Sequence, residues 1–152
     1  MTEQVLHTLK SPESDEEWRS YHAIRRKVLF ENRGLFGVYD EKRPDEFIEG
    51  HHPLVLLHRG ESIGTIRVDI DGTRAIFRRV AVRDDLQGRG HGKAMLSLAE
   101  AFVRERKCEV IMSFVNPGAV GFYERCGFTK DDSSAPSINH VPMSKWLLQT
   151  TY

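Results

Sequence analysis

Apolar residues along the chain follow two different spacings, which predict a mixture of helices and strands. From Ser14 onward, apolar side chains recur at helical spacing, and Glu17 completes a capping-box signature for the start of a helix. Gly34 is expected to end this helix. Ahead of it, alternating residues in Gln4–Leu9 predict a short first strand.

Further along, alternation with a period of two predicts an antiparallel meander. Turns at Arg59-Gly60 and Asp71-Gly72 separate its three strands, which we place at Leu54–His58, Ile63–Asp69 and Arg74–Val82. Residues 34–50 lack a clear period, so we expect an irregular loop there with one short helix.

The second half of the chain is typical of strand, helix and strand in succession. One apolar helical face is formed by Met95, Leu98, Ala99, Phe102 and Val103. The buried strand Val110–Val115 follows, which favours a right-handed parallel crossover. Asn116-Pro117 then marks the start of a short helix from about Ala119 to Gly127. Closing strands are expected near Phe128–Lys130 and His140–Leu147. These elements predict an α/β (α+β) fold, a mixed central sheet of about six to seven strands flanked by helices, in a single domain over residues 1–152.

Composition changes this picture little. The 152 residues are 39% hydrophobic and 29% charged, as in an ordinary soluble globular protein. Basic and acidic residues both number 22, so charge favours neither a nucleic acid nor a membrane surface as partner. No apolar stretch suits a membrane span or a leader, and we expect a cytoplasmic protein. Cys108 and Cys126 form no C-x-x-C pair and are interpreted as reduced packing residues.

Three glycines, Gly88, Gly90 and Gly92, stand at alternate positions between a predicted strand and a predicted helix. A Walker loop is excluded because Ala94 follows Gly92-Lys93, where serine or threonine is required. The dinucleotide fingerprint G-x-G-x-x-G is also missed, because its last glycine has the wrong spacing.

The loop still has the features of an anion site. Glycines allow several backbone N–H groups to converge on one point. No acidic residue occurs from Leu86 to Ala99, whereas Arg89, His91 and Lys93 lie in the loop and first helical turn. This pattern predicts that an external phosphate binds at the helix N-terminus. The alternative is a flexible connector with solvated basic side chains.

At these residues the chain resembles a known family. Gln87-Gly88-Arg89-Gly90-His91-Gly92 is similar to the Q/R-x-x-G-x-G/A signature of the GNAT superfamily of acyl-CoA-dependent N-acetyltransferases, and "NPGAVGFYERCGF" is similar to its second motif. The resemblance covers roughly Leu54 to Trp146. It implies a GNAT-like sheet whose fourth and fifth strands are splayed, with acetyl-CoA as the acyl donor.

The resemblance also implies roles for individual residues. The loop would bind the coenzyme pyrophosphate through Gln87, Gly88, Arg89, Gly90, His91, Gly92 and Lys93. The backbone of Val80, Ala81 and Val82 would pair with the pantetheine arm, and the Val80 N–H would polarise the thioester carbonyl. Tyr123 would be the general acid that protonates the leaving thiolate, and Asn116 would contact the cofactor.

Several points stay open at this level. The general base could be His140, Asp69 or water, because the fourth strand carries no acid. Phe36, Tyr39 and Phe47 could line the acceptor pocket or simply pack under their loop. His51-His52 lacks a third ligand at matching spacing, so no metal site is predicted. A homodimer is a reasonable expectation if the closing strands offer a free edge.

The leading functional hypothesis is an N-acetyltransferase that moves an acetyl group from acetyl-CoA to a primary amine of a small molecule or peptide. The amine would attack directly in a ternary complex. An alternative is a non-catalytic acyl-CoA-binding sensor module. A third hypothesis, a nucleotide phosphate binder, is disfavoured by the failed Walker spacing.

Overall fold

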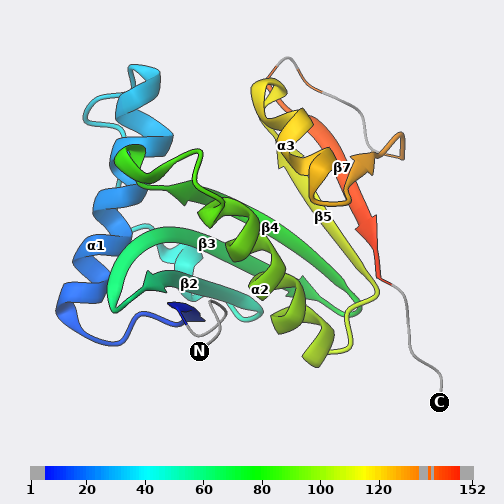
Figure 1. Cartoon of the computed structure of the whole chain (residues 1–152), viewed down its shortest axis with the longest axis horizontal. Helices are drawn as coiled ribbons and strands as arrows, with labels where there is room; N and C mark the ends of the chain where they lie inside the picture. The colour runs from blue at the N-terminus through cyan, green and yellow to red at the C-terminus, as the bar shows by residue number, and fades with distance from the viewer. Residues whose placement is uncertain (1–5, 134–136, 138, 148–152) are drawn as a thin grey trace.

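The computed structural model describes residues 6–133, 137 and 139–147. Its centre is a seven-stranded mixed sheet with strand order β1-β2-β3-β4-β5-β7-β6 (Figure 1). Only β4 and β5 pair in parallel among these strands. The strands are β1 His7–Lys10, β2 His51–His58, β3 Glu61–Asp71, β4 Arg74–Val82, β5 Val110–Val115, β6 Thr129–Lys130 and β7 Val141–Trp146. The predicted mixed sheet is thereby confirmed.

Strand boundaries follow the sequence pattern closely where the local signals are strong. β4 and β5 have the predicted bounds, whereas β2 and β3 are longer than the alternation indicated. The first strand begins at His7, and residues 4 and 5 of its predicted range lie outside the described part. A long loop precedes β2, and it contains the expected short helix, the 3-10 turn η4 Pro44–Phe47.

Helix α1, Asp15–Arg25, begins where the capping box places it. Ser14 Oγ accepts a hydrogen bond from the Glu17 N–H at 3.0 Å, and the Glu17 carboxylate accepts one from the Ser14 N–H. The helical path continues through the π-helical turn η2, Arg26–Phe30, and the 3-10 turn η3, Glu31–Arg33. Gly34 ends it with a left-handed conformation at φ 79°.

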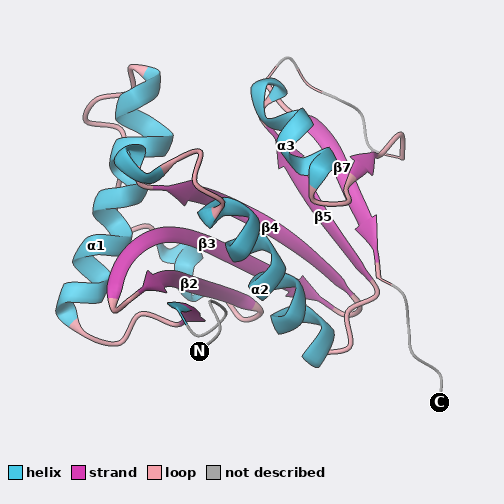
Figure 2. Ribbon diagram, in the orientation of Figure 1, coloured by secondary structure: helices cyan, strands magenta, loops and turns pink. Residues whose placement is uncertain are grey.

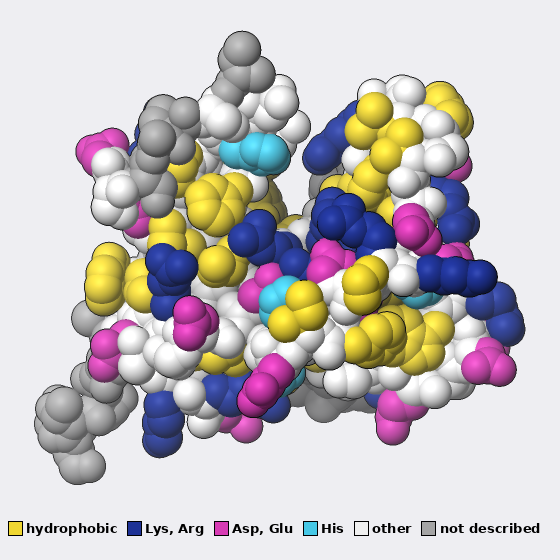
Figure 3. Space-filling model, turned by 180° about the vertical axis from the view of Figure 1, so that it is seen from behind, with side chains coloured by type: hydrophobic (Ala, Val, Ile, Leu, Met, Phe, Trp, Pro, Cys, Tyr) yellow, Lys and Arg dark blue, Asp and Glu magenta, His cyan; other side chains and the backbone are white. Residues whose placement is uncertain are grey.

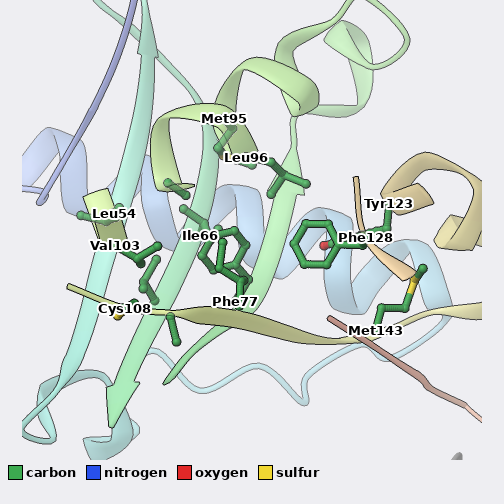
Figure 4. Packing of buried hydrophobic residues seen from close by; sticks show 14 of the residues in the cluster. Leu54, Ile66, Phe77, Met95, Leu96, Val103, Cys108, Tyr123, Phe128 and Met143 are labelled. Carbon is green, nitrogen blue, oxygen red and sulfur yellow. The ribbon is translucent and has the colours of Figure 1, made fainter. Parts of the chain in front are cut away.

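Helix α2, His91–Glu105, covers one face of the sheet and makes the apolar core with it (Figure 2). Its buried side chains include Met95, Ala99 and Val103, all on the predicted apolar face. They pack on Ile66 and Phe77 from β3 and β4 (Figure 4). The same cluster extends to Tyr123, in the short helix α3, Val120–Arg125, and to Phe128 just after it.

The opposite face of β3 is polar although it is buried. Arg67 and Asp69, two residues apart and therefore on one face of the strand, are 4% and 8% exposed. Helix α1 packs against β3, and it contributes Arg25, while η4 contributes the buried Glu46. A layer of buried ion pairs thus lies on the face away from α2.

β4 and β5 separate along their length, as the resemblance implied. Their parallel pairing runs from Arg74 with Val110 to Phe77 with Ser113 and continues no further among the described residues. The register between β3 and β4 also shifts just past this point, between Thr65 and Arg67. No helix in the described part of the chain is long and apolar enough to cross a membrane.

Candidate active site

A cleft of about 1380 Å³ opens where β4 and β5 separate. The second half of β4 forms one wall, and β5 with α3 forms the other. The glycine loop closes one end, and η2 with the loop before β2 also contributes to the lining. In Figure 3 this face is hollowed between two lobes, with arginine and lysine side chains along the base of the hollow.

A bulge in β4 shapes the first wall. Thr65 pairs with Ala81 and Arg67 pairs with Arg78, so β4 has one more residue than β3 across this span. Arg79 lies in the extra stretch at φ 56°, a conformation that is uncommon for residues other than glycine. The Thr65 hydroxyl donates to the Arg79 carbonyl at 3.2 Å and holds the bulge in place. The backbone of β4 beyond Phe77 is consequently turned toward the cleft without a β5 partner in the described chain.

The glycine loop ends in a helix N-terminus that carries no side-chain cap. Gly88 and Gly90 have φ angles of 77° and 89°, so both positions need glycine. Gly90 is the N-cap of α2, and the first turn contains no acidic residue. Because the first N–H groups of a helix lack partners within it, those of α2 are available to an anion.

The start of the loop is fixed by hydrogen bonds to β3 and β4. The Gln87 side-chain nitrogen donates to the Val82 carbonyl at 2.9 Å, and the Arg83 N–H donates to the Ile63 carbonyl at 2.9 Å. The 3-10 turn η5, Asp84–Leu86, lies between them. Gln87 therefore positions the loop through its side chain, which the sequence motif does not reveal.

Tyr123 lies on the second wall at the level where the strands part. Its side chain is 6% exposed, and the phenol hydrogen-bonds the Ser113 hydroxyl. Burial raises the pKa of Tyr123 to about 12, and the hydrogen bond with Ser113 opposes this rise. The Tyr123 hydroxyl is consequently protonated throughout the physiological range and can act as a proton donor.

Asn116 and Gly92 have structural explanations of their own. Asn116 Oδ1 accepts a hydrogen bond from the Gly118 N–H at 3.0 Å and caps the 3-10 turn η6, Pro117–Ala119. A Cβ at Gly92 would lie 3.1 Å from Cζ of Phe122, so this glycine lets α2 approach α3. Asn116 also lines the cleft, and its contact with the cofactor stays a prediction.

Ten of the twelve predicted site residues line one cleft: Val80, Ala81, Val82, Gln87, Gly88, Gly90, Gly92, Lys93, Asn116 and Tyr123. The side chains of the other two, Arg89 and His91, do not belong to its described lining. Arg89 is exposed, and His91 is 9% exposed with its ring turned toward β1 and β2. Only the backbone of His91 is therefore left for the predicted anion site.

The imidazole of His91 belongs to a cluster of three histidines. Its Nδ1 lies 2.9 Å from Nε2 of His7, and His58 stacks on His7 with ring centroids 4.5 Å apart. One nitrogen from each ring lies within 4.8 Å of the others, so this cluster could hold a divalent ion after small rearrangements. No local sequence pattern indicates this cluster, because the three residues come from distant parts of the chain.

The end of the cleft opposite the glycine loop is lined by charged groups that the sequence pattern missed. Asp69 accepts hydrogen bonds from Arg67 Nε at 2.8 Å and from Arg78 Nε at 3.1 Å. Arg67 also donates to Asp45 Oδ2 at 3.0 Å. Glu46 accepts from Arg25 and from the Tyr21 hydroxyl.

This arrangement bears on the predicted general bases. Asp69 lines the cleft, but two arginines and the nearby His51 occupy its oxygens. His140 is exposed, lines the cleft, and has its Nδ1 3.5 Å from the Ser137 hydroxyl. His140 or water is thus sterically and electrostatically the more accessible proton acceptor of the three.

The three loop aromatics divide between two environments. Phe36 and Phe47 are 71% and 73% exposed and do not belong to the described lining of the cleft. Tyr39 is half-buried and its ring packs against Phe30 at 5.1 Å between centroids. Tyr39 therefore packs under the loop and also lines a smaller cavity beside the cleft, so it is compatible with both predicted alternatives.

Comparisons with known proteins agree with this geometry. The model of the family described as "Acetyltransferase (GNAT) family" matches residues 9–128. The chain is 27% identical over 142 residues to "Putative acetyltransferase BSU40680" of Bacillus subtilis (strain 168). That alignment covers 90% of this chain and 95% of the Bacillus protein.

Solved structures share the fold over nearly the whole chain. A "putative N-acetyltransferase" from Lactobacillus plantarum matches with a TM-score of 0.75 at 25% identity, covering 93% of this chain and 97% of the other. The PaiA N-acetyltransferase of Thermoplasma acidophilum, solved in complex with coenzyme A, matches with a TM-score of 0.72 at 16% identity. Its alignment covers 93% of this chain and 99% of that one.

Proposed function

Because the chain belongs to the acetyltransferase (GNAT) family, we propose that it moves an acetyl group from acetyl-CoA to a primary amine of a small molecule or peptide. The amine attacks the thioester directly while both substrates are bound. The observation that carries this proposal is the opening between β4 and β5, with uncapped helix amides at one end and Tyr123 on its wall.

The glycine loop and β4 supply the coenzyme site in this proposal. N–H groups at the start of α2 bind the pyrophosphate, and Lys93 adds a positive charge at the same end of the cleft. Val80, Ala81 and Val82 line the cleft beyond the last pair of β4 with β5, where their backbone can bind the pantetheine arm as a strand would. The coenzyme A complex of the Thermoplasma relative supports the assignment of this ligand class.

The chemistry needs no side-chain nucleophile. The amine nitrogen forms a bond to the thioester carbon, and the Val80 N–H stabilises the oxyanion, a contact worth roughly 3 kcal/mol in comparable sites. The carbon–sulfur bond then breaks, and the departing thiolate takes the proton of the Tyr123 hydroxyl. The phenolate recovers a proton from the nitrogen through water, so the site returns to its starting state.

The test is thiol release from acetyl-CoA in the presence of a panel of amines, amino acids, polyamines, aminoglycosides and peptides. We expect release that depends on one class of amine, together with an acetylated amine detected by mass spectrometry. Coenzyme binding by calorimetry without transfer to any amine would contradict the proposal and leave a sensor module as the function.

A further inference from the structure

We infer that the acceptor is an amine that also carries a carboxylate, and that Arg79 binds this carboxylate in a small cavity beside the cleft. This inference rests on the proposed acetyl transfer and names the chemical class of its acceptor. The cavity, of about 50 Å³, is lined in part by Arg25 and Tyr39. It shares Phe30, Arg43, Asp45 and Arg79 with the wall of the cleft.

Arg79 is a half-buried cation without an anionic partner. In the described part of the chain its side chain makes no hydrogen bond and no ion pair, and its guanidinium carbon lies 5.7 Å from the centroid of the Phe30 ring. Burial lowers the pKa of Arg79, and the nearby Arg25, Arg67 and Arg43 lower it further, while Asp45 opposes them. A partly buried charge in such surroundings gains from an external anion.

Arg25 places a second guanidinium in the lining of the same cavity. The side chain is 4% exposed, and its Nη1 donates to the Tyr21 hydroxyl at 2.7 Å and to Glu46. Its Nε is the buried side-chain atom that lacks a hydrogen-bond partner among the described residues. Arg25 therefore adds positive charge to the wall of the cavity, while the hydrogen bond to the carboxylate comes from Arg79.

Two of the acidic residues nearby are already engaged by arginines, and Asp40 in the cavity lining is exposed and accepts a hydrogen bond from the Lys42 N–H. Asp69 is bound by Arg67 and Arg78, and Asp45 by Arg67. The wall of the cavity and this end of the cleft carries more arginines than carboxylates: Arg25, Arg33, Arg43, Arg67, Arg78 and Arg79 against Asp40, Asp45, Glu46 and Asp69. Basic side chains accordingly surround the base of the hollow in Figure 3. A polyamine would meet repulsion here.

The position of Arg79 limits the size of the acceptor. Arg79 precedes Val80, whose N–H holds the thioester carbonyl in the proposed reaction, and consecutive Cα atoms are about 3.8 Å apart. The positive φ of Arg79 belongs to the same bulge that exposes this backbone. A carboxylate bound at Arg79 therefore lies about one arginine side chain from the reacting carbon, a separation that suits a free amino acid or the end of a short peptide.

The experiment compares acetyl transfer to amino acids with transfer to the corresponding amino acid amides, which keep the amine and the shape but lose the negative charge. We expect kcat/KM to favour the free acids at least tenfold. In Arg79→Met this preference disappears, while the KM for acetyl-CoA stays unchanged. A hydrogen-bonded charge pair is worth about 1.5–3 kcal/mol, which corresponds to a loss of roughly 10- to 150-fold on the free acids.

Arg59→Met is the matched control, because Arg59 is also an arginine at positive φ, 53°, but lies exposed in the turn between β2 and β3. It should keep the wild-type preference, and Arg79→Lys should restore part of it. Equal rates on acids and amides, a preference for polyamines, or an unchanged preference in Arg79→Met would overturn the inference and leave acetyl transfer standing. A preference for phosphoethanolamine over every amino acid would also overturn the carboxylate assignment.

Failure of the proposed function is recognised separately. If no amine releases thiol, the carboxylate site is measured by thermal shift of the protein saturated with coenzyme A, using the free amino acids and their amides as ligands. Stabilisation by free acids that is absent in Arg79→Met would support the site without the reaction. The same shift with acids and amides, or none with either, would overturn it.

Discussion

Removal of the Tyr123 hydroxyl is the sharpest perturbation of the proposed chemistry. With the pKa of Tyr123 raised to about 12, proton transfer to a thiolate of pKa about 8.5 is uphill by roughly 5 kcal/mol. A general acid contributes about 10²–10⁴-fold, and so weak an acid should contribute near the lower end of that range. We therefore expect Tyr123→Phe to lower kcat about 100-fold, with an unchanged KM for acetyl-CoA.

The structure separates this effect from loss of stability. The hydroxyl is bonded to Ser113, whose own Oγ still donates to the Phe77 carbonyl at 3.1 Å after the change. Loss of one such bond costs about 1 kcal/mol, which lowers Tm by about 2–4 °C. Ser113→Ala is the matched control, because it removes the same hydrogen bond but keeps the phenol. Its kcat should fall by no more than roughly fivefold.

The pH dependence gives an independent check. Because burial raises the pKa of Tyr123 to about 12, the group stays protonated and the activity should not fall as pH rises toward about 11. Activity should instead rise with pH as the amine loses its proton, near pH 8 for an α-amine and near pH 10 for a lysine-like amine. Stopped assays of thiol release measure both. A loss below threefold in Tyr123→Phe, or a basic limb near pH 9 that this variant abolishes, would refute the reasoning.

Three further changes test the loop and the buried ion pairs. Gly90→Ala places a side chain at φ 89° with open space around it, so strain alone of about 1–2 kcal/mol should lower Tm and weaken coenzyme binding in calorimetry; an unchanged Tm contradicts this. In Gly92→Ala the added Cβ would lie 3.1 Å from Cζ of Phe122 and would push that ring away. The KM for acetyl-CoA should therefore rise, although alanine favours the helix by about 1 kcal/mol. An unchanged KM would contradict the packing argument. Glu46→Gln leaves Arg25 buried without its anion, and urea unfolding should show a loss of about 3–5 kcal/mol; a loss below 1 kcal/mol would show that this pair is dispensable.

Most elements of the fold could be predicted from local sequence patterns. The capping box at Ser14, the glycine at 34 and the bounds of β4 and β5 each depend on neighbours within a few residues, so the sequence pattern is sufficient to predict them. The glycine loop was predictable for the same reason. Its glycines, which permit a positive φ, and its lack of acidic residues are both visible within a few consecutive positions. Local rules hold wherever the controlling contacts are local.

The polar face of β3 shows where such reasoning fails. By alternation, Arg67 and Asp69 are the residues that should face solvent, since Ile66 and Val68 face the core. They are buried because α1 and η4, from residues far away in the chain, cover that face. The resemblance implied that the fourth and fifth strands are splayed, but the position of the bulge at Arg79 could not be predicted, because no glycine marks it and it is defined only by the register of the neighbouring strand.

That bulge connects the fold to the proposed reaction more directly than any single side chain. One extra residue in β4 shifts its register against β3, and the pairing with β5 stops within two residues of it. The strand that leaves the bulge therefore has backbone groups free for a thioester, while the residue within it, Arg79, carries an unpaired charge into the acceptor end of the cleft. Without the bulge, β4 would pair with β5 along its length. The proposed coenzyme site and the proposed acceptor site would then both be closed. The positive φ of Arg79, 56°, is thus a local strain that accompanies the separation of β4 from β5, on which both proposed sites depend.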